Sequence, residues 1–278
     1  MTSPSDNNFE RHTVDAVPAL SEGFLRELVA ELDNDDIVGI ILGGSYVRGD
    51  ATPYSDIDLG CFYKDDAALP AKSFFYRNSL LVSVSPKTVA SSYNDLTRPE
   101  KAIFLAASPC LVLLDKDGSV KQLVREIAAF RWEPLQQAAN EYASLELTLA
   151  AELVHKILSE ILRRDDMAIA YATAKLLFEL TNTVAVQRGV AVRSDRVYYL
   201  QVQTSVGIAS VWSRYHRIVA GIDELPASVS SIKVRAVAAL HLYQETAMLL
   251  RPVLQPDHSA VVEQALRVFQ EAGPRLRL

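Results

Sequence analysis

Residues 39–60 read GIILGGSYVRGDATPYSDIDLG, and this stretch decides the fold of the first half of the chain. A short apolar run with β-branched residues, 37–42, predicts a buried strand that ends at two glycines. A second run, 57–63, alternates between apolar and polar residues and predicts another strand. The stretch therefore indicates two strands that are connected through a glycine-serine turn and a short helix.

Two acidic residues stand at the start of the second strand. Asp56 and Asp58 are two positions apart, so both side chains are expected on one face of the sheet. Two carboxylates this close repel each other unless a cation lies between them. Mg²⁺ prefers oxygen ligands and is commonly held by carboxylates together with substrate phosphates and water. The pair therefore predicts a magnesium site.

The turn before these residues suits an anion. At Gly44-Ser45 the backbone N–H groups can approach phosphate oxygens without a side chain in the way. A helix after the turn would direct its positive end toward the same anion. Taken alone, such a turn is usually only a loop, and an Asp-x-Asp pair is usually a solvated strand end. Their order, with strands on both sides, favours binding of a nucleoside triphosphate.

The same residues carry a resemblance to a known family. Gly44-Ser45, ten further residues and then Asp56-Ile57-Asp58 resemble the signature of the DNA polymerase β-like nucleotidyltransferase superfamily. The small bacterial members are the most similar, namely the aminoglycoside and lincosamide nucleotidyltransferases and the minimal nucleotidyltransferases of toxin–antitoxin pairs. The resemblance implies that Gly44 and Ser45 hold the β- and γ-phosphates and that Arg48 assists nucleotide binding. It also implies that Asp56 and Asp58 hold Mg²⁺.

One position departs from the pattern of this superfamily, whose members often carry a third carboxylate on a neighbouring strand. The matching segment is 80–84, which places Ser83 at that position. A serine binds Mg²⁺ poorly and is no general base. Three explanations are open: the general base lies elsewhere in the chain, segment 80–84 is not the strand that matches the superfamily, or the domain does not catalyse a reaction. Other carboxylates that could substitute are Asp95, Glu100 and Asp115.

A second set of candidate residues lies in the helical part of the chain. Helical spacing places Glu152, His155 and Lys156 on one face of a long helix. The residue types alone favour a surface ion pair between Glu152 and Lys156. The resemblance to antibiotic nucleotidyltransferases implies instead that Glu152 is the base toward the acceptor hydroxyl and that Lys156 contacts a nucleotide phosphate. His155 is an alternative base, or it lines the acceptor pocket.

The hydrophobic pattern changes its period along the chain. In the first half it predicts helices at 21–32 and 120–130 and further strands at 73–76, 80–85 and 110–114. From Pro134 onward it predicts helices at 134–162, 167–187, 195–204, 206–220, 228–250 and 259–270. We therefore predict an α+β fold, with a mixed-sheet domain over 1–132 and an all-helical bundle over 133–278.

Composition narrows the class of protein. The chain has 278 residues, of which 49% are hydrophobic, and a net charge of −6, which is typical of globular proteins. This acidic balance argues against a nucleic-acid binder. No apolar stretch approaches the ~18 residues that a membrane span needs, and the N-terminus lacks the apolar core of a signal peptide. Cys61 and Cys110 stand in apolar segments, which favours reduced thiols and a cytoplasmic location.

Together these features predict an adenylyltransferase. We expect Mg²⁺-dependent transfer of a nucleoside monophosphate, preferably AMP from ATP, onto a hydroxyl of a small molecule bound between the two domains. An aminoglycoside-like antibiotic is one such acceptor. One alternative is an enzyme of the antitoxin type that attaches AMP to a protein tyrosine, and another, motivated by Ser83, is a nucleotide-binding module without turnover. The sequence leaves the oligomeric state open, a homodimer included.

Overall fold

A computed structural model describes residues 19–223, 231–273 and 276. Their contacts divide the chain into two compact units. The sheet unit comprises Met1–Tyr93 and Ser108–Ala129, and the helical unit comprises Asn94–Ala107 and Phe130–Leu278. Each unit has a hydrophobic core of its own. The two are therefore described separately below.

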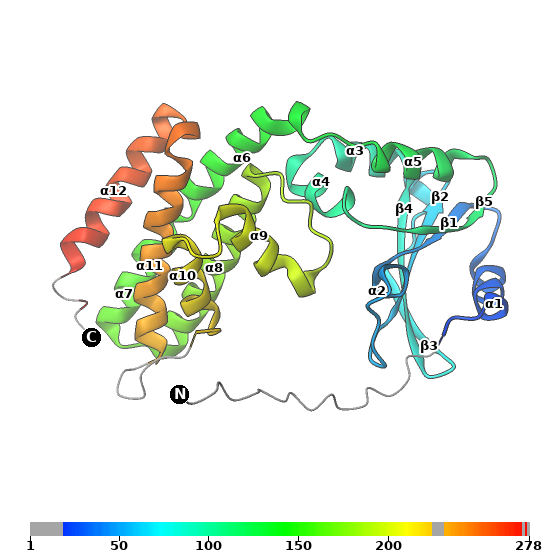
Figure 1. The fold of residues 1–278 in the computed structure, drawn as a ribbon, viewed down its shortest axis with the longest axis horizontal. Coiled ribbons are helices and arrows are strands. Elements are labelled where there is room, and N and C mark those ends of the chain that lie inside the picture. Colours follow the sequence, from blue (N-terminus) through cyan, green and yellow to red (C-terminus); the bar gives the residue numbers. More distant parts are fainter. Residues whose placement is uncertain (1–18, 224–230, 274–275, 277–278) are drawn as a thin grey trace, which may run out of the picture. The chain divides into compact units, whose positions relative to one another are not determined.

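A mixed five-stranded sheet forms the first unit, in the order β3-β4-β2-β1-β5 (Figure 1). Strands β2 and β4 are parallel, and the other neighbours are antiparallel. The predicted strands at 37–42 and 57–63 are confirmed at those bounds, and the predicted pair at 73–76 and 80–85 is a hairpin. The strands are β1 Ile37–Leu42, β2 Ile57–Tyr63, β3 Ser73–Arg77, β4 Leu80–Thr88 and β5 Leu111–Asp115.

Helix α1, Glu22–Leu32, covers one face of this sheet and confirms the helix predicted at 21–32. It begins after Ser21, whose hydroxyl accepts the N–H of Phe24 at 3.1 Å. Its buried Leu28 packs with apolar side chains of β1 and β2 in a continuous core. Cys61 of β2 belongs to that core, and burial raises the pKa of its thiol to about 11.

Helix α5, Ser119–Ala128, packs against the other face of the sheet (Figure 1). Val120 at its start lies so close to Gly39 of β1 that a Cβ on Gly39 would be 2.6 Å from a Val120 methyl carbon. A glycine in this strand therefore lets the helix approach the sheet. Further elements of the first half are α2 Gly44–Arg48, η1 Asp66–Ala68, α3 Val89–Leu96 and, in the helical unit, α4 Pro99–Leu105.

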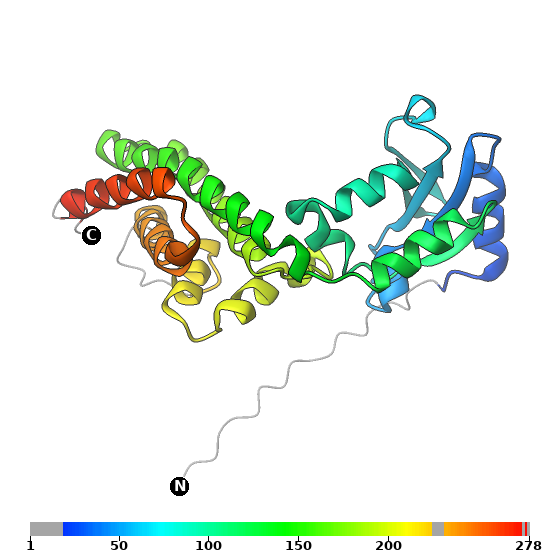
Figure 2. The same cartoon turned by 90° about the horizontal axis from the view of Figure 1, so that it is seen from above.

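The second unit is a bundle in which α8 contacts α6, α7, α10 and α11 (Figures 1 and 2). Its core is built from leucine, valine and alanine side chains of all these helices. Among the residues that the structure describes, no helix combines the length and the apolar composition that crossing a bilayer requires. The bounds are η2 Glu133–Leu135, α6 Gln136–Leu149, α7 Ala151–Arg163, α8 Asp166–Gln187, η3 Asp195–Val197, α9 Tyr198–Val206, α10 Val211–Ala220, α11 Ser231–Leu250, η4 Arg251–Val253 and α12 Pro256–Ala272.

The single helix predicted over 134–162 is wrong, because α6 and α7 meet at Ala150. There ψ is −15°, and the Ala150 carbonyl accepts the N–H of Leu153 at 3.0 Å, which is a bond of the 3₁₀ type. The helix predicted over 206–220 starts later, at Val211, because Gly207 adopts a positive φ and Ser210 caps the new helix. Of the helix predicted over 228–250, residues 228–230 lie outside the described part of the chain.

Candidate active site

The turn between β1 and β2 is built on glycines. Gly43 is extended, Gly44 has a φ of +70°, and a short helix, α2 Gly44–Arg48, follows at once. Ser45 is buried in this helix, with 8% of its surface exposed. Gly49 ends the helix with a φ of +77°. The glycine-serine turn and the short helix predicted from the sequence are therefore both present.

The second acidic residue of the motif lies directly against this turn. The N–H of Gly43 donates to the backbone oxygen of Asp58 at 2.8 Å. A Cβ on Gly44 would collide with the Asp58 carboxylate. Only glycine leaves room for that carboxylate, and only glycine adopts the positive φ at little cost. The fold thus brings the turn and Asp58 to the same end of the sheet.

The electrostatics of this end depend on four charged groups. Burial raises the pKa of the Asp58 carboxyl, and the neighbouring Asp56 raises it further, whereas Lys72 and Arg48 lower it. Strand β2 begins at Ile57, so Asp56 lies one residue before it. A partly buried carboxylate with a second acid beside it gains from a nearby cation.

A hard divalent cation fits these residues. The donors are carboxylate oxygens, and a bound Mg²⁺ would offset both the burial and the mutual repulsion that raise the pKa of Asp58. Among residues 19–223, 231–273 and 276, no three histidine, cysteine, aspartate or glutamate side chains gather closely enough to hold a metal ion. A Mg²⁺ ion held by Asp56 and Asp58 would therefore complete its coordination with water and substrate phosphate.

Ser83 is the residue of β4 that stands opposite Asp58. Strands β2 and β4 run parallel with Asp58 and Ser83 in register, and Ser83 in turn pairs with Phe74 of β3. Ser83 is 2% exposed. The neighbouring strand thus presents a buried hydroxyl, and no carboxylate, beside Asp58.

Lys72 is a residue of this end that sequence analysis missed. It lies just before β3, and its charge lowers the pKa of Asp58. Its ammonium nitrogen is 4.9 Å from the centre of the Phe74 ring, so the two side chains share one face of the hairpin. The available signal was the period of two along the strand, which places Lys72 on the face of Phe74.

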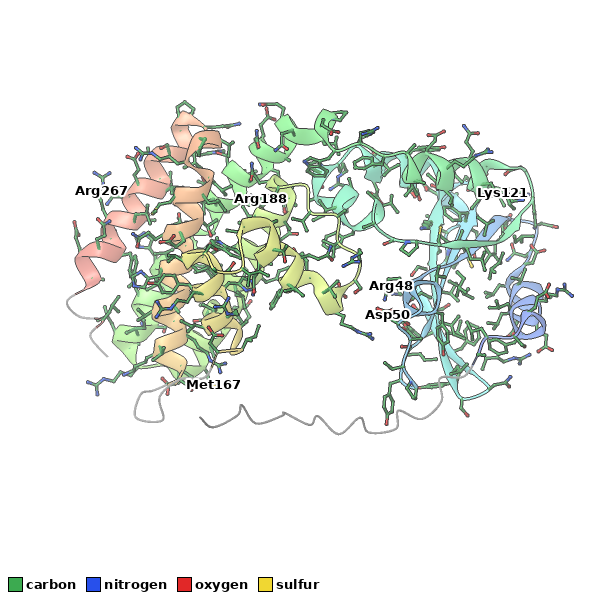
Figure 3. All side chains as sticks on the ribbon, in the orientation of Figure 1. Arg48, Asp50, Lys121, Met167, Arg188 and Arg267 are labelled. Carbon is green, nitrogen blue, oxygen red and sulfur yellow. The ribbon has the colours of Figure 1, made fainter. Side chains whose placement is uncertain are left out.

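Arg48 ends α2 and pairs with Asp50, with Nε 3.2 Å from a carboxylate oxygen (Figure 3). The same guanidinium lowers the pKa of Asp58. The positive charge of Arg48 therefore lies near the carboxylates of Asp50 and Asp58. Arg48 thus supplies positive charge near Asp58 while its guanidinium pairs with Asp50, and its role in nucleotide binding stays a prediction.

Glu152, His155 and Lys156 are all exposed on α7 of the helical unit. The ammonium of Lys156 lies 5.8 Å from the centre of the Tyr171 ring. Among the ion pairs of the described residues, none joins Glu152 to Lys156, so the surface ion pair that the residue types favoured is not formed. The catalytic roles of these residues stay predictions.

Two of the three carboxylates considered as substitutes for the missing one have other partners. Asp115 accepts the N–H groups of Gly118 and Lys121, at 3.0 and 3.1 Å, and so orders the start of α5. Glu100 belongs to the helical unit, where it pairs with Arg98 at 2.6 Å. Asp95 lies in α3.

One further acid stands out in the helical unit. Burial raises the pKa of Glu146, and the nearby carboxylates of Glu179 and Glu100 raise it further. The signal in the sequence was its place on α6 between the buried Ala143 and Leu147, which turns an acid toward the core. Glu146 is therefore an acid with a raised pKa that sequence analysis did not single out.

Part of the chain is similar to known proteins. Residues 24–103 match the family described as nucleotidyltransferase domain. A solved structure of a nucleotidyltransferase-like protein from Exiguobacterium sibiricum is 14% identical, with a TM-score of 0.48, and the match covers 82% of this chain and 76% of that one. No curated protein matches the chain. The matched residues contain the turn, both aspartates and Ser83, and residues 24–103 are therefore similar to the nucleotidyltransferase domains of the DNA polymerase β-like superfamily.

Proposed function

We propose that this protein transfers a nucleoside monophosphate, preferably AMP from ATP, to a hydroxyl group of a small molecule. The observation that carries the proposal is the Asp58 carboxylate lying against Gly44, with Asp56 beside it. A phosphate-binding turn and a metal-binding acid pair are the two parts that such a transfer needs, and here they meet.

Each residue of the site has a role in this reaction. The backbone N–H groups at Gly44 and Ser45 bind the outer phosphates, and Arg48 and Lys72 supply positive charge around them. Asp56 and Asp58 hold Mg²⁺, which when bound neutralises phosphate charge and makes the α-phosphorus easier to attack. The acceptor oxygen bonds to the α-phosphorus, the bond to the bridging oxygen breaks, and pyrophosphate leaves.

The proton of the acceptor hydroxyl needs a base, because Ser83 offers none opposite Asp58. We assign this role to Glu152 and the contact with a phosphate to Lys156, on the strength of the resemblance to antibiotic nucleotidyltransferases. Both side chains are exposed and free to meet a substrate. His155, on the same exposed face, is the alternative base or a residue of the acceptor pocket.

The metal pair is tested by Asp56→Asn and Asp58→Asn. Each change removes one anionic ligand and keeps the shape of the side chain, so Mg²⁺-dependent binding of ATP should be lost while the fold persists. Titration calorimetry with ATP, with and without Mg²⁺, measures the effect. Asp35→Asn is the matched control, because it removes an exposed charge from the same unit. Asn variants that bind Mg²⁺ and ATP like the parent would overturn the proposal.

The base is tested by Glu152→Gln. A well-placed general base contributes ~10²–10⁴-fold in rate, so turnover should fall by that factor with nucleotide affinity nearly unchanged. Lys156→Ala should instead weaken triphosphate binding, because it removes a positive charge. Glu141→Gln, an exposed change on α6, is the control for a lost surface charge. Unchanged turnover in Glu152→Gln would exclude this residue and direct the same test to His155.

One assay separates this function from its alternatives. ATP labelled at the α-phosphate is incubated with the protein, Mg²⁺ and either a panel of aminoglycosides or a cell extract. Label on a small molecule together with released pyrophosphate supports the proposal, and label on a protein tyrosine supports protein AMPylation instead. Tight ATP binding without pyrophosphate release supports a silent binding module, which the buried Ser83 beside Asp58 favours as the second candidate.

A further inference from the structure

A small pocket lies in the helical unit, between α8, α10 and α11. Its volume is about 300 Å³. Most of its wall is aliphatic, with Leu177, Val219 and Ile232 among the lining residues, and the ring of Tyr199 closes one side. Two polar residues complete the lining, Thr173 of α8 and Arg235 of α11.

Both polar residues present a buried atom that lacks a hydrogen-bond partner. These atoms are Oγ1 of Thr173 and Nε of Arg235, and Thr173 is 6% exposed. The other threonines of α8 behave differently. Thr181 and Thr183 donate to the carbonyls four residues earlier, at 2.6 and 2.8 Å. Buried polar groups without partners are rare in folded proteins, and two that line one pocket point to a ligand.

The guanidinium of Arg235 lies close to the backbone at the end of α10. An added Cβ on Gly221 would be 2.8–2.9 Å from the guanidinium atoms. Gly221 ends α10 with a φ of +75°, and a cation at a helix C-terminus is favourable by itself. In that position, however, Nε of Arg235 has no hydrogen-bond partner. The nearby acid Asp223 is engaged by Arg217, with Nε 3.1 Å from its carboxylate.

We propose that this pocket binds a small organic anion with one carboxylate head and an apolar body. The Nε edge of a guanidinium presents two parallel N–H donors whose spacing matches the two oxygens of a carboxylate. The Thr173 hydroxyl donates a further hydrogen bond to the head. The aliphatic wall and the Tyr199 ring enclose the body, and the volume suits about ten heavy atoms. Inorganic phosphate would fill the polar end alone.

The test uses the full chain and three carboxylates of increasing size: acetate, benzoate and 4-phenylbutyrate. Affinity is measured by ligand-observed NMR and should rise along this series as more apolar surface is buried. The neutral 4-phenylbutanol and inorganic phosphate serve as separate probes of the body and of the head. Each should bind more weakly than 4-phenylbutyrate.

Substitutions of Arg235 and Thr173 test whether these two residues bind the carboxylate. Arg235→Gln should weaken 4-phenylbutyrate binding about 10- to 100-fold, and Thr173→Val about 3- to 10-fold. Thr183→Val removes a paired hydroxyl from the same helix and should leave binding unchanged. Without ligand, Thr173→Val should melt at a higher temperature than the parent, because it removes a buried hydroxyl that has no partner. This melting curve also shows that the variant is folded.

Several results would overturn the proposal. The first is that none of the three carboxylates binds at millimolar concentration. The second is that 4-phenylbutanol or inorganic phosphate binds as tightly as 4-phenylbutyrate, because then either the head or the body is not recognised. The third is that Arg235→Gln binds 4-phenylbutyrate like the parent.

Discussion

At the scale of single residues, His216 shows how burial fixes a protonation state. It is fully buried, and Nδ1 and Nε2 are each 3.0 Å from a partner, Gln203 Nε2 and Thr181 Oγ1. Because the Gln203 amide donates to Nδ1 and the Thr181 hydroxyl already donates to Leu177, the neutral ring with its proton on Nε2 satisfies every group. Burial, with a smaller effect from Arg217, lowers the pKa of His216 from 6.5 to about 4.

This residue predicts how the helical unit responds to acid. The unfolded chain takes up a proton near pH 6.5 and the folded chain only near pH 4, so stability is complete above pH 6.5 and falls as the pH drops toward 4. The loss amounts to roughly 3 kcal/mol. Urea unfolding followed by tryptophan emission between pH 4 and 7.5 measures it, because Trp212 stacks on His216 with ring centres 4.9 Å apart.

The control separates His216 from other titrating groups. His216→Gln should show a flatter dependence of the unfolding free energy on pH, whereas His155→Gln, an exposed change, should retain the slope of the parent. Equal slopes in the parent and in His216→Gln would show that another group titrates.

At the scale of elements, the turn from β1 into α2 contains two glycines that do different things. Gly44 and Gly49 both have a positive φ, at +70° and +77°. A side chain on Gly49 would meet nothing within 4 Å, whereas one on Gly44 would strike the Asp58 carboxylate. Gly49 is thus required by backbone conformation alone, and Gly44 by conformation and by the space that the acid occupies.

The matched pair Gly44→Ala and Gly49→Ala tests this distinction. Gly49→Ala should cost about 1–2 kcal/mol of unfolding free energy, the price of a left-handed alanine, and should retain Mg²⁺-dependent ATP binding. Gly44→Ala should destabilise the sheet unit more and lose ATP binding, because Asp58 must move. Hydrogen exchange of β1 and β2 reports stability, and calorimetry reports binding. Equal effects of the two changes would contradict the close packing of Asp58 on the turn.

The bounds of an element were predictable where neighbouring residues in the sequence mark them. They were not predictable where contacts with distant residues set them. Strands β1 and β2 were predicted to the residue, because apolar runs between glycines and acids mark them. The strand predicted over 80–85 continues to Thr88 through Pro86. Pairing with β3 stops at Val84, so the nitrogen of Pro86, which carries no hydrogen, faces no ladder on that side. No residue near Ala150 breaks a helix, and the interruption there left no trace in the sequence.

The site was predictable to a similar extent. Spacing along one chain segment was enough to bring Gly44 and Asp58 together. The position of Ser83 opposite Asp58 depends on the register of β4, which the resemblance suggested and the ladder shows. Lys72 was missed because it precedes an edge strand, and its proximity to Asp58 follows from a hairpin that folds back beside β2. When two charged residues from different strands lie close together, as Lys72 and Asp58 do, their spacing in the sequence does not indicate it.

At the scale of the whole molecule, the two cores share no residue. The chain has two tryptophans, Trp132 and Trp212, and both belong to the helical unit. Trp132 packs over Gly189, which follows α8 with a φ of +60°, and Trp212 lies in the core of the bundle. Tryptophan emission therefore reports on the helical unit, whereas circular dichroism reports on both units.

This division predicts how core substitutions separate the two signals. Ile40→Ala removes buried volume from the core of the sheet unit and should lower its unfolding free energy by about 2–5 kcal/mol. Thermal melting followed by circular dichroism should then begin at a lower temperature, with the tryptophan-monitored transition unchanged. Leu240→Ala, in the core of the bundle, should shift the tryptophan signal instead. If Ile40→Ala moved both signals by the same amount, the chain would unfold as one unit.

The burial of Cys61 has a practical consequence. A thiol whose pKa is about 11 is ionised to roughly one part in ten thousand at neutral pH, and only the thiolate reacts with alkylating reagents. Burial also raises the pKa of Cys110, which is partly enclosed. In the folded protein we therefore expect Cys61 to react slowly with maleimides. A cysteine introduced at an exposed position, such as Lys175 on α8, could carry a fluorophore or spin label while Cys61 stays unmodified.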